Sequence, residues 1–417
     1  MDDTEVVPPS FSMHLDADEL RSRLEPLFRE NFEKHGELGA AVSIWQNGKS
    51  ILDLQGGFCD THRQKPWTAS TLALIWSATK GLGSACLLHV LQEHKIDIDR
   101  RVAEFWPEFG QAGKDGITLA QLLSHQAGLC ALDRQVDVLN YAAVIEALEK
   151  QKPIWPPGSA HGYHARTFGF LLDELVRRIT GGPLSNYWRK SFSEALDLDV
   201  WIGLPDSEQD RVATMYAAKA GKPPEPKQFY VDLATPGTLA RQTFTSPRGL
   251  HAISAMNAPE IPAQPIVSFG GIGTALSLAK FYAVLANNGR LLATASPSDG
   301  GQDRPASAAL RRGGRFFSRE TLALMTTTMT EGLDRVFQIP TAFSAGFMKD
   351  VPDTTRRIFG PSPLAFGHPG AGGSHAFADL ENGIAFAYVM NQMEQSLLPN
   401  EKSLRLVREL YREQTRH

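Results

Sequence analysis

Residues 74–83 read LIWSATKGLG, and within them Ser77 and Lys80 form a Ser-x-x-Lys motif. A serine hydroxyl is a weak nucleophile at neutral pH and needs a base within hydrogen-bond reach. On a helix, positions i and i+3 lie on the same face, so a helix beginning at Ser77 would bring the Lys80 amine to the hydroxyl. Burial lowers the pKa of a lysine and so makes it a base. The motif therefore predicts a nucleophile with an activating base one helical turn away.

A second copy of the motif, Ser277 with Lys280, shows that the spacing alone has little specificity. The two copies differ in their surroundings. Ser77 follows an apolar run and precedes a segment rich in small residues (81–85), which can pack closely and keep Lys80 dry. The stretch around Ser277 is typical of an ordinary amphipathic helix with its lysine toward solvent. We therefore expect Ser277 to be a surface or capping serine, and Ser77 to be the candidate nucleophile.

A lysine-assisted serine also needs a group that carries the proton onward and donors for the oxyanion. Tyr163 follows a Pro/Gly turn and precedes a predicted helix over 167–180, and a nearby ammonium would lower its pKa. Residues 366–374, FGHPGAGGS, lead into a predicted strand, where a backbone N–H can face an oxyanion. The structural alternatives are a packed aromatic and a plain glycine turn. His125 is interpreted as a structural histidine near a helix end.

Both ends of the chain carry hairpin signals. Asn47-Gly48 separates two apolar runs within residues 40–54, and Glu381-Asn382-Gly383 separates 374–378 from 384–390. Each end also has a segment with helical periodicity. The pattern predicts an α+β fold in which one antiparallel sheet is built from both chain ends and flanked by helices. We expect a discontinuous sheet domain (1–80 and 240–417), a mainly helical domain (81–239), and the active site at their interface.

The composition and the motifs argue against several classes of function. The chain has 417 residues and a net charge of −4, which favours neither nucleic acid nor a membrane surface as a partner. No run approaches the ~18 apolar residues of a spanning helix. The acidic start lacks a signal-peptide core, so we expect a cytoplasmic protein with reduced thiols at its three cysteines, Cys59, Cys86 and Cys130. No metal-ligand spacing, Walker A loop, H-E-x-x-H or G-x-S-x-G is present, and no cofactor is implied.

These motifs in this order resemble the serine β-lactamase and penicillin-binding-protein superfamily, most closely class C β-lactamases and the family VIII carboxylesterases that share their fold. The resemblance covers residues 38–391 and includes the segment 117–129, ITLAQLLSHQAGL. It implies that Ser77 is the acylated nucleophile and that Lys80 and Tyr163 are acid/base groups. It also implies an oxyanion hole made by the backbone N–H groups of Ser77 and Ala371.

Two departures from the family pattern bear on the substrate. Ala165 stands where the family's Tyr-x-Asn motif has its asparagine, and His368 stands where its Lys-Thr-Gly motif has its lysine. In β-lactamases those groups bind the amide and the carboxylate of the antibiotic, so their loss should weaken recognition of an acidic β-lactam. The resemblance makes His368 and Gly370 substrate-binding candidates. Trp76 and Trp155 are further candidates as pocket-lining aromatics.

We therefore expect a serine carboxylesterase that acts on small or short-chain esters, with a small-molecule substrate as its partner. A weak β-lactamase, a D-amino-peptidase or amidase, and an acyltransferase remain alternatives, because all use the same acyl-enzyme. A non-catalytic binding module is disfavoured by the intact Ser77, Lys80 and Tyr163. The natural ester, the oligomeric state, and the choice between Lys80 and Tyr163 as primary base stay open at this point.

Overall fold

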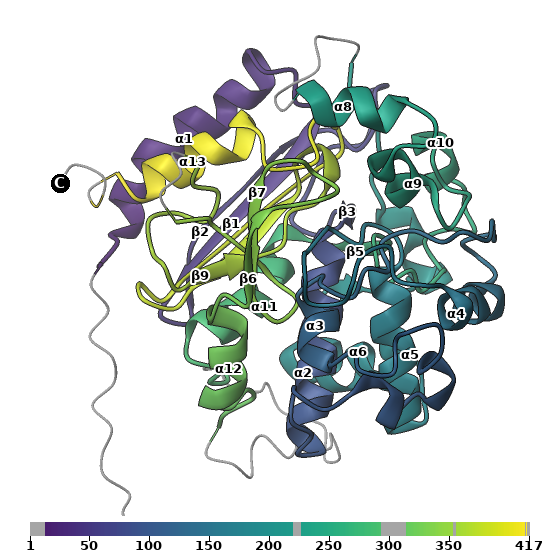
Figure 1. Cartoon of the computed structure of the whole chain (residues 1–417). Helices are drawn as coiled ribbons and strands as arrows, with labels where there is room; N and C mark the ends of the chain where they lie inside the picture. The colour runs from purple at the N-terminus through teal and green to yellow at the C-terminus, as the bar shows by residue number, and fades with distance from the viewer. Residues whose placement is uncertain (1–12, 220–226, 293–313, 353–355, 413, 415–417) are drawn as a thin grey trace, which may run out of the picture.

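The computed structural model describes residues 13–219, 227–292, 314–352, 356–412 and 414. Within them, the largest element is an antiparallel sheet of eight strands in the order β2-β1-β11-β10-β9-β8-β7-β6. Figure 1 shows purple strands from the start of the chain beside yellow-green strands from its end. β1 (Gly39–Gln46) pairs with β11 (Ile384–Met390), with Ala40 opposite Met390 and Gln46 opposite Ile384. The two chain ends therefore form one continuous sheet.

Both predicted hairpins are present. β1 turns into β2 (Lys49–Gly57) through Asn47 and Gly48, whose φ angles are 52° and 76°. A two-residue hairpin turn with positive φ at both positions favours Asn-Gly, because both residues tolerate the left-handed region. β10 (His375–Asp379) turns into β11 near Gly383, which also has a positive φ of 62°. Local turn chemistry thus sets the register of the central strands.

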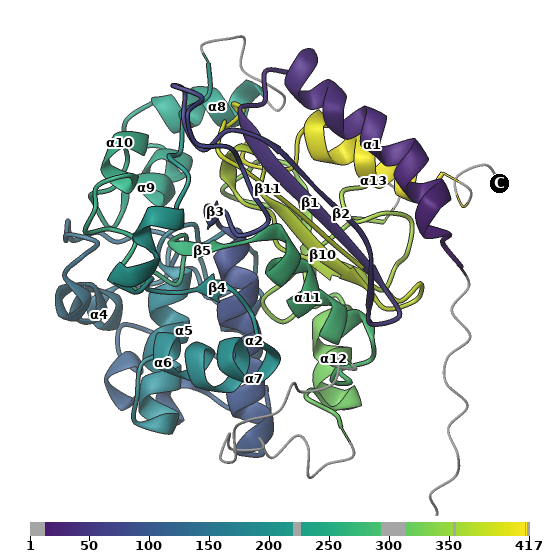
Figure 2. The same cartoon turned by 180° about the vertical axis from the view of Figure 1, so that it is seen from behind.

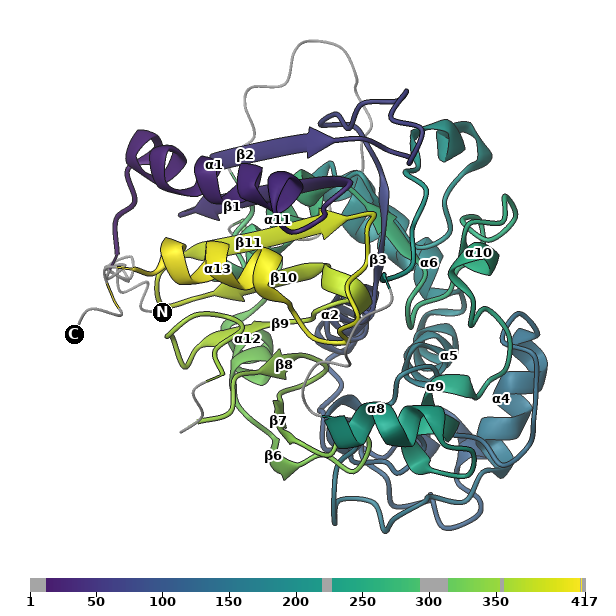
Figure 3. The same cartoon turned by 90° about the horizontal axis from the view of Figure 1, so that it is seen from above.

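Helices cover both faces of the sheet. α1 (Ala17–Glu33) and α13 (Glu401–Leu410) lie side by side on one face, and α11 (Ala275–Ala286) packs against β1, β10 and β11 from the other (Figures 2 and 3). β10 and β11 are buried along their whole length as a result. The remaining strands of this sheet are β6 (Thr330–Leu333), β7 (Pro340–Phe343), β8 (Met348–Lys349) and β9 (Ala365–Gly367).

α2 (Ala78–Glu93) runs between the sheet and the other helices, and it is buried from Ala78 to Leu91 (Figure 3). Its small residues make this possible. A Cβ at Gly83 would lie 2.6 Å from the Val267 side chain, and one at Gly81 would lie 2.5 Å from the Tyr282 hydroxyl. α5 (Phe168–Thr180) and α6 (Leu184–Trp188) pack against it, and α4 (Tyr141–Lys150) packs on α5. α3 (Leu119–Leu123) precedes α4 in the same helical part.

A short three-stranded sheet leads into α2. Its order is β3 (Ala73–Trp76), β5 (Gly271–Gly273) and β4 (Val200–Trp201), and β3 ends at the residue before Ser77. The further helices in the described ranges are α7 (Glu194–Leu196), α8 (Lys227–Ala234), α9 (Leu239–Thr245), α10 (Ile253–Met256) and α12 (Arg319–Thr326).

The predicted fold class is confirmed: an antiparallel sheet from both chain ends carries helices, and a mainly helical part lies beside it. The domain boundaries at 80/81 and 239/240 stay a prediction. Across the described ranges, no helix combines the length and the apolar character that crossing a bilayer requires.

A buried polar network joins α1, β11 and α13. The Tyr388 hydroxyl donates to Glu37 at 2.7 Å, and the Lys402 ammonium lies 3.4 Å from the same carboxylate. The Asn31 amide donates to the Tyr388 hydroxyl and to the Lys402 carbonyl. Burial raises the pKa of Glu37, and the charge of Lys402 opposes that rise. The chain ends are thus held together by polar contacts as well as by strand pairing.

We predict that Lys402→Met lowers the free energy of unfolding by about 3 kcal/mol, because it leaves the Glu37 carboxylate buried without its ion pair. The double variant Glu37→Gln/Lys402→Met should regain more than half of that loss, since neither charge then remains buried. Denaturant titration of both variants tests this. A double variant no more stable than Lys402→Met would contradict the assignment.

Candidate active site

Ser77 stands at the junction of β3 and α2. Its own backbone is helical, but the preceding Trp76 has a φ of 51°, in the left-handed region. The Thr79 hydroxyl donates to the Trp76 carbonyl at 2.5 Å and accepts from the Gly271 N–H at 2.8 Å, which holds this sharp turn in place. The Ser77 side chain makes no capping hydrogen bond to α2. Its half-buried hydroxyl is therefore left to face other groups.

Lys80 meets Ser77 as the motif predicts. The Lys80 Nζ is 3.2 Å from Ser77 Oγ and donates to the Ser268 carbonyl at 2.6 Å. The Lys80 side chain is fully buried. Burial lowers its pKa well below the usual range, and the nearby positive charge of Arg166 lowers it further. A lysine whose pKa is lowered in this way gives up its proton more readily than an exposed one, so its amine can act as a base toward the hydroxyl.

Tyr163 lies over the same pair, with Lys80 Nζ 5.0 Å from its ring centroid. Tyr163 is buried, and burial raises the pKa of its phenol; the charge of Asp334 adds to the rise, while a hydrogen bond with Ser77 opposes it. The expectation that a neighbouring ammonium lowers this pKa is therefore wrong. Burial disfavours the phenolate, and the same burial lowers the pKa of Lys80. Tyr163 is a protonated phenol and thus a proton donor.

Asp334 is a part of this site that the sequence analysis missed. It is fully buried between β6 and β7, and both of its carboxylate oxygens accept from the Tyr163 N–H, at 3.3 and 3.2 Å. It also accepts from the N–H groups of Val336 and Phe337 and from the Thr341 hydroxyl. Burial raises its pKa to about 6, against these four donors. Because 171 residues separate Asp334 from Tyr163, no local sequence motif could predict the contact.

Aromatic rings fix the orientation of the Tyr163 side chain. Phe337 stacks on it with centroids 4.8 Å apart, and His125 and His368 lie 5.3 and 5.9 Å away. His125 follows α3, as expected, and packs on Phe168 at 4.3 Å. Burial lowers the pKa of His125 well below its usual value. It lies against the site as a neutral ring.

His368 occupies the turn between β9 and β10. Its Nδ1 lies 2.9 Å from the Pro369 carbonyl, and within the described residues its Nε2 has no hydrogen-bond partner. Burial lowers its pKa to about 3, and the Lys80 charge acts in the same direction. His368 is therefore neutral at pH 7. A Cβ at Gly370 would lie 2.2 Å from the Ile75 carbonyl, so only glycine lets this turn, with Ala371 next in sequence, approach the end of β3.

The structure separates the remaining candidates. Trp76 is half-buried beside Ser77, whereas Trp155 is buried, donates to the Gln126 carbonyl and packs on His164. Ser277 is buried in α11 rather than exposed on the surface, and its hydroxyl accepts the Asp199 N–H at 2.9 Å. Lys280 turns away from it toward Asp197. The substrate contacts predicted for Trp76, Trp155, His368 and Gly370 stay predictions.

Known proteins match most of this chain. A family model described as Beta-lactamase matches residues 24–408. The esterase/beta-lactamase LipL of Mycobacterium tuberculosis is 30% identical over 369 residues, 86% of this chain and 78% of the relative. The solved structure of a penicillin-binding protein homologue from Caulobacter crescentus is 33% identical, with a TM-score of 0.79 over 94% of this chain and 97% of that one. A family VIII carboxylesterase structure is 32% identical, with a TM-score of 0.78 over the same shares.

We predict that Asp334 makes stability pH-dependent. Its pKa is about 6 in the folded protein and about 4 in an unfolded chain. Its contribution to stability is thus complete below pH 4 and is lost as the pH rises through 6. Asp334→Asn does not titrate, so between pH 4 and 7 the wild type should lose about 3 kcal/mol of unfolding free energy relative to the variant. Denaturant titrations at four pH values test this, and parallel curves would contradict it.

Proposed function

Because the chain belongs to the beta-lactamase family of serine hydrolases, we propose that it is a carboxylesterase for small or short-chain esters. Two of the similar proteins above carry esterase in their names. The observation that carries the proposal is the pairing of Ser77 with a buried Lys80 at 3.2 Å, beside a neutral His368. The first feature supports attack on an acyl carbon. The second supports a substrate without an obligatory acidic group.

In the proposed acylation step, Ser77 Oγ attacks the ester carbonyl carbon and its proton passes to the Lys80 amine. The backbone N–H groups of Ser77 and Ala371 hold the oxyanion. The ester C–O bond then breaks, and the Tyr163 phenol gives its proton to the leaving alkoxide while Lys80 returns one to Tyr163. The products of this step are the released alcohol and an acyl group on Ser77.

Deacylation repeats the sequence with water in place of the alcohol. Lys80 takes a proton from water as its oxygen attacks the acyl carbon, and Ser77 Oγ leaves with a proton from the same network. The directions of the two pKa shifts support this division of roles, since Lys80 is poised as the base and Tyr163 as the acid. The acid is then released and the site is restored.

His368 and Ala165 support an ester over an acidic β-lactam. In the family's lactamases, a lysine and an asparagine at these positions bind the antibiotic's carboxylate and amide. His368 is buried and uncharged at pH 7, and Ala165 is a buried methyl group. Without a cation at position 368, a carboxylate placed there would lose its hydration with no charge partner at that position. Neutral esters carry no such cost.

β-Lactam hydrolysis is the second candidate, since LipL carries both activities in its name. It would use the same acyl-enzyme. Amide hydrolysis and acyl transfer to an alcohol remain further alternatives on the same grounds. They differ only in which group leaves and which nucleophile resolves the acyl group.

We predict that Ser77→Ala lowers kcat/KM for p-nitrophenyl acetate, butyrate and octanoate at least ~10³-fold, because it removes the attacking atom. The matched control is Ser277→Ala, the serine of the second motif, which should keep wild-type turnover. Nitrocefin assayed in parallel should be a far poorer substrate than the esters. Dominant nitrocefin turnover would favour the β-lactamase instead, and full ester activity in Ser77→Ala would reject the site.

We also predict a pH dependence set by Lys80. Its lowered pKa means that kcat/KM for p-nitrophenyl butyrate rises with pH and levels off well below the ordinary lysine pKa of about 10.4. Lys80→Arg keeps a permanent charge and removes the base, so turnover should fall ~10²–10⁴-fold at every pH up to 9. Lys280→Arg, in the second motif, is the control and should match the wild type. An unchanged profile in Lys80→Arg would contradict this role.

A further inference from the structure

The segment that carries Tyr163 is attached to the hairpin of β6 and β7 by contacts that the proposed chemistry does not use. The N–H of Arg335, in the turn between the two strands, donates to the His161 carbonyl at 3.1 Å. Two residues further along the segment, the Tyr163 N–H donates to Asp334 in the same turn. Residues 161–163 therefore lie along the turn of this hairpin.

The close approach of this segment to the hairpin requires a glycine between His161 and Tyr163. A Cβ at Gly162 would lie 2.8 Å from the Trp155 ring and 3.2 Å from the Val336 side chain. Any larger residue would push the segment away from the turn or from Trp155. The polar contacts with the hairpin are therefore left to the residues on either side of Gly162.

The His161 imidazole bridges the two strands of the hairpin. Its Nδ1 lies 3.1 Å from the Thr330 hydroxyl on β6, and its Nε2 lies 2.9 Å from the Thr341 hydroxyl on β7. The Thr341 hydroxyl in turn donates to Asp334 at 3.1 Å. His161, Thr341 and Asp334 are all buried. A continuous series of hydrogen bonds therefore runs from Thr330 to the carboxylate that accepts the Tyr163 N–H.

The direction of these hydrogen bonds follows from the chemistry of the groups. A threonine hydroxyl has one proton, and Thr341 gives it to Asp334, so Thr341 accepts from the N–H at His161 Nε2. Burial lowers the pKa of His161, which favours the neutral ring with a single N–H. Its Nδ1 is then an acceptor for the Thr330 hydroxyl. Every donor in the series thus points toward Asp334.

We propose that His161 is a positioning residue for the reaction, an inference that rests on the proposed esterase function. His161 holds the Thr341 hydroxyl as a donor to Asp334. Asp334 in turn holds the Tyr163 backbone where the phenol meets Ser77. An imidazole suits this position because one rigid ring presents an acceptor to one strand and a donor to the other.

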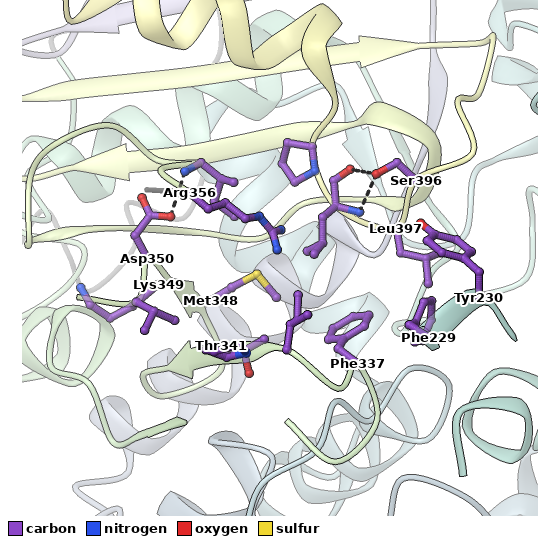
Figure 4. Close-up of a pocket in the computed structure, with 16 residues that line it drawn as sticks. Phe229, Tyr230, Phe337, Thr341, Met348, Lys349, Asp350, Arg356, Ser396 and Leu397 are labelled. Atoms are coloured by element: carbon purple, nitrogen blue, oxygen red, sulfur yellow. Dashed lines mark hydrogen bonds between the residues drawn. The ribbon is translucent and has the colours of Figure 1, made fainter. Parts of the chain in front are cut away.

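The other side of the hairpin gives these contacts more weight. A cavity of about 390 Å³ lies between β7, β8, α8 and the segment 396–399, and Figure 4 shows Phe337 and Thr341 at its wall. A hairpin beside an empty space has fewer packing contacts to hold it in place. Phe337 belongs to the same hairpin and stacks on Tyr163. Loss of the His161 contacts should therefore disturb both the backbone and the ring of Tyr163.

Esters with different leaving groups test the positioning of the proton donor. An ethoxide leaving group needs a proton, whereas p-nitrophenolate leaves without one, because it is a much weaker base. His161→Asn should therefore lower kcat/KM for ethyl butyrate at least about tenfold more than kcat/KM for p-nitrophenyl butyrate. The ratio of the two values does not depend on how much of the variant is folded. Equal losses on the two esters would reduce His161 to a structural role and overturn the proposal.

Variants of Thr341 test the next step of the series. Thr341→Val removes the hydroxyl at nearly constant volume and should change the ratio as His161→Asn does, whereas Thr341→Ser should keep the wild-type ratio. The double variant His161→Asn/Thr341→Val should change the ratio no more than Thr341→Val alone, because the series is already broken. Equal ratios in Thr341→Val and Thr341→Ser would count against the proposal.

Two further histidine variants separate the hydrogen bond from the loss of a ring. His161→Gln, whose amide can still donate from near the place of Nε2, should recover part of the effect of His161→Asn. His89→Asn is the matched control, since it removes a buried imidazole that bonds the Tyr187 hydroxyl near the other end of α2. It should leave the ratio unchanged. A ratio changed as much in His89→Asn as in His161→Asn would contradict a specific role for His161.

Hydrogen exchange at the Tyr163 amide needs no substrate and separates this inference from the ester function. Mass spectrometry of overlapping peptides should show exchange at Tyr163 faster by about tenfold or more in His161→Asn and Thr341→Val, since Asp334 then holds the amide less firmly. Unchanged exchange in both variants would overturn the proposal. Faster exchange in a protein that hydrolyses neither ester would support the positioning of Tyr163 by His161 and reject the ester function.

Discussion

The removal of water from Lys80 is the constraint on which the rest of this structure depends. An exposed lysine would be an ammonium and could not take a proton from Ser77. The chain meets the requirement by burying α2 from Ala78 to Leu91, with glycines where a methyl group would clash with neighbouring elements. One hydrogen bond from the Lys80 amine to the Ser268 carbonyl fixes the orientation of the amine. The packing that buries α2 therefore also lowers the pKa of Lys80.

The same burial acts on the other ionisable groups with opposite results. It holds Tyr163 as a phenol and keeps His368 neutral, because burial disfavours the charged form of either type. Burial thus disfavours charge on the Lys80 amine, on the Tyr163 phenol and on the His368 imidazole. Such a site suits a neutral ester, whose charge develops only as the oxyanion forms. An acidic β-lactam would instead be favoured by a positive charge at the position of His368.

Tyr163 also depends on parts of the chain that the motifs do not include. Asp334 accepts its N–H and Phe337 stacks on its ring, and both come from the segment between β6 and β7. The edge of the large sheet therefore positions Tyr163, the proposed proton donor, while Ser77, the proposed nucleophile, stands at the start of a helix. Phe337 also lines the cavity between β7, β8, α8 and the segment 396–399, so the same ring contacts Tyr163 and that cavity. In the proposed mechanism, the orientation of the proton donor thus depends on packing at the sheet edge.

The sequence by itself determined the hairpins at Asn47-Gly48 and before Ile384, the helix that ends at Gly181, and the Ser77–Lys80 pair, because each rests on neighbours in the chain. Tertiary structure alone decided the pKa direction of Tyr163 and the contact of Asp334. It also assembled the cavity, whose walls come from residues 229 to 399. The physical reason is that turns and helix spacing are local, whereas desolvation and buried hydrogen bonds join residues far apart in sequence.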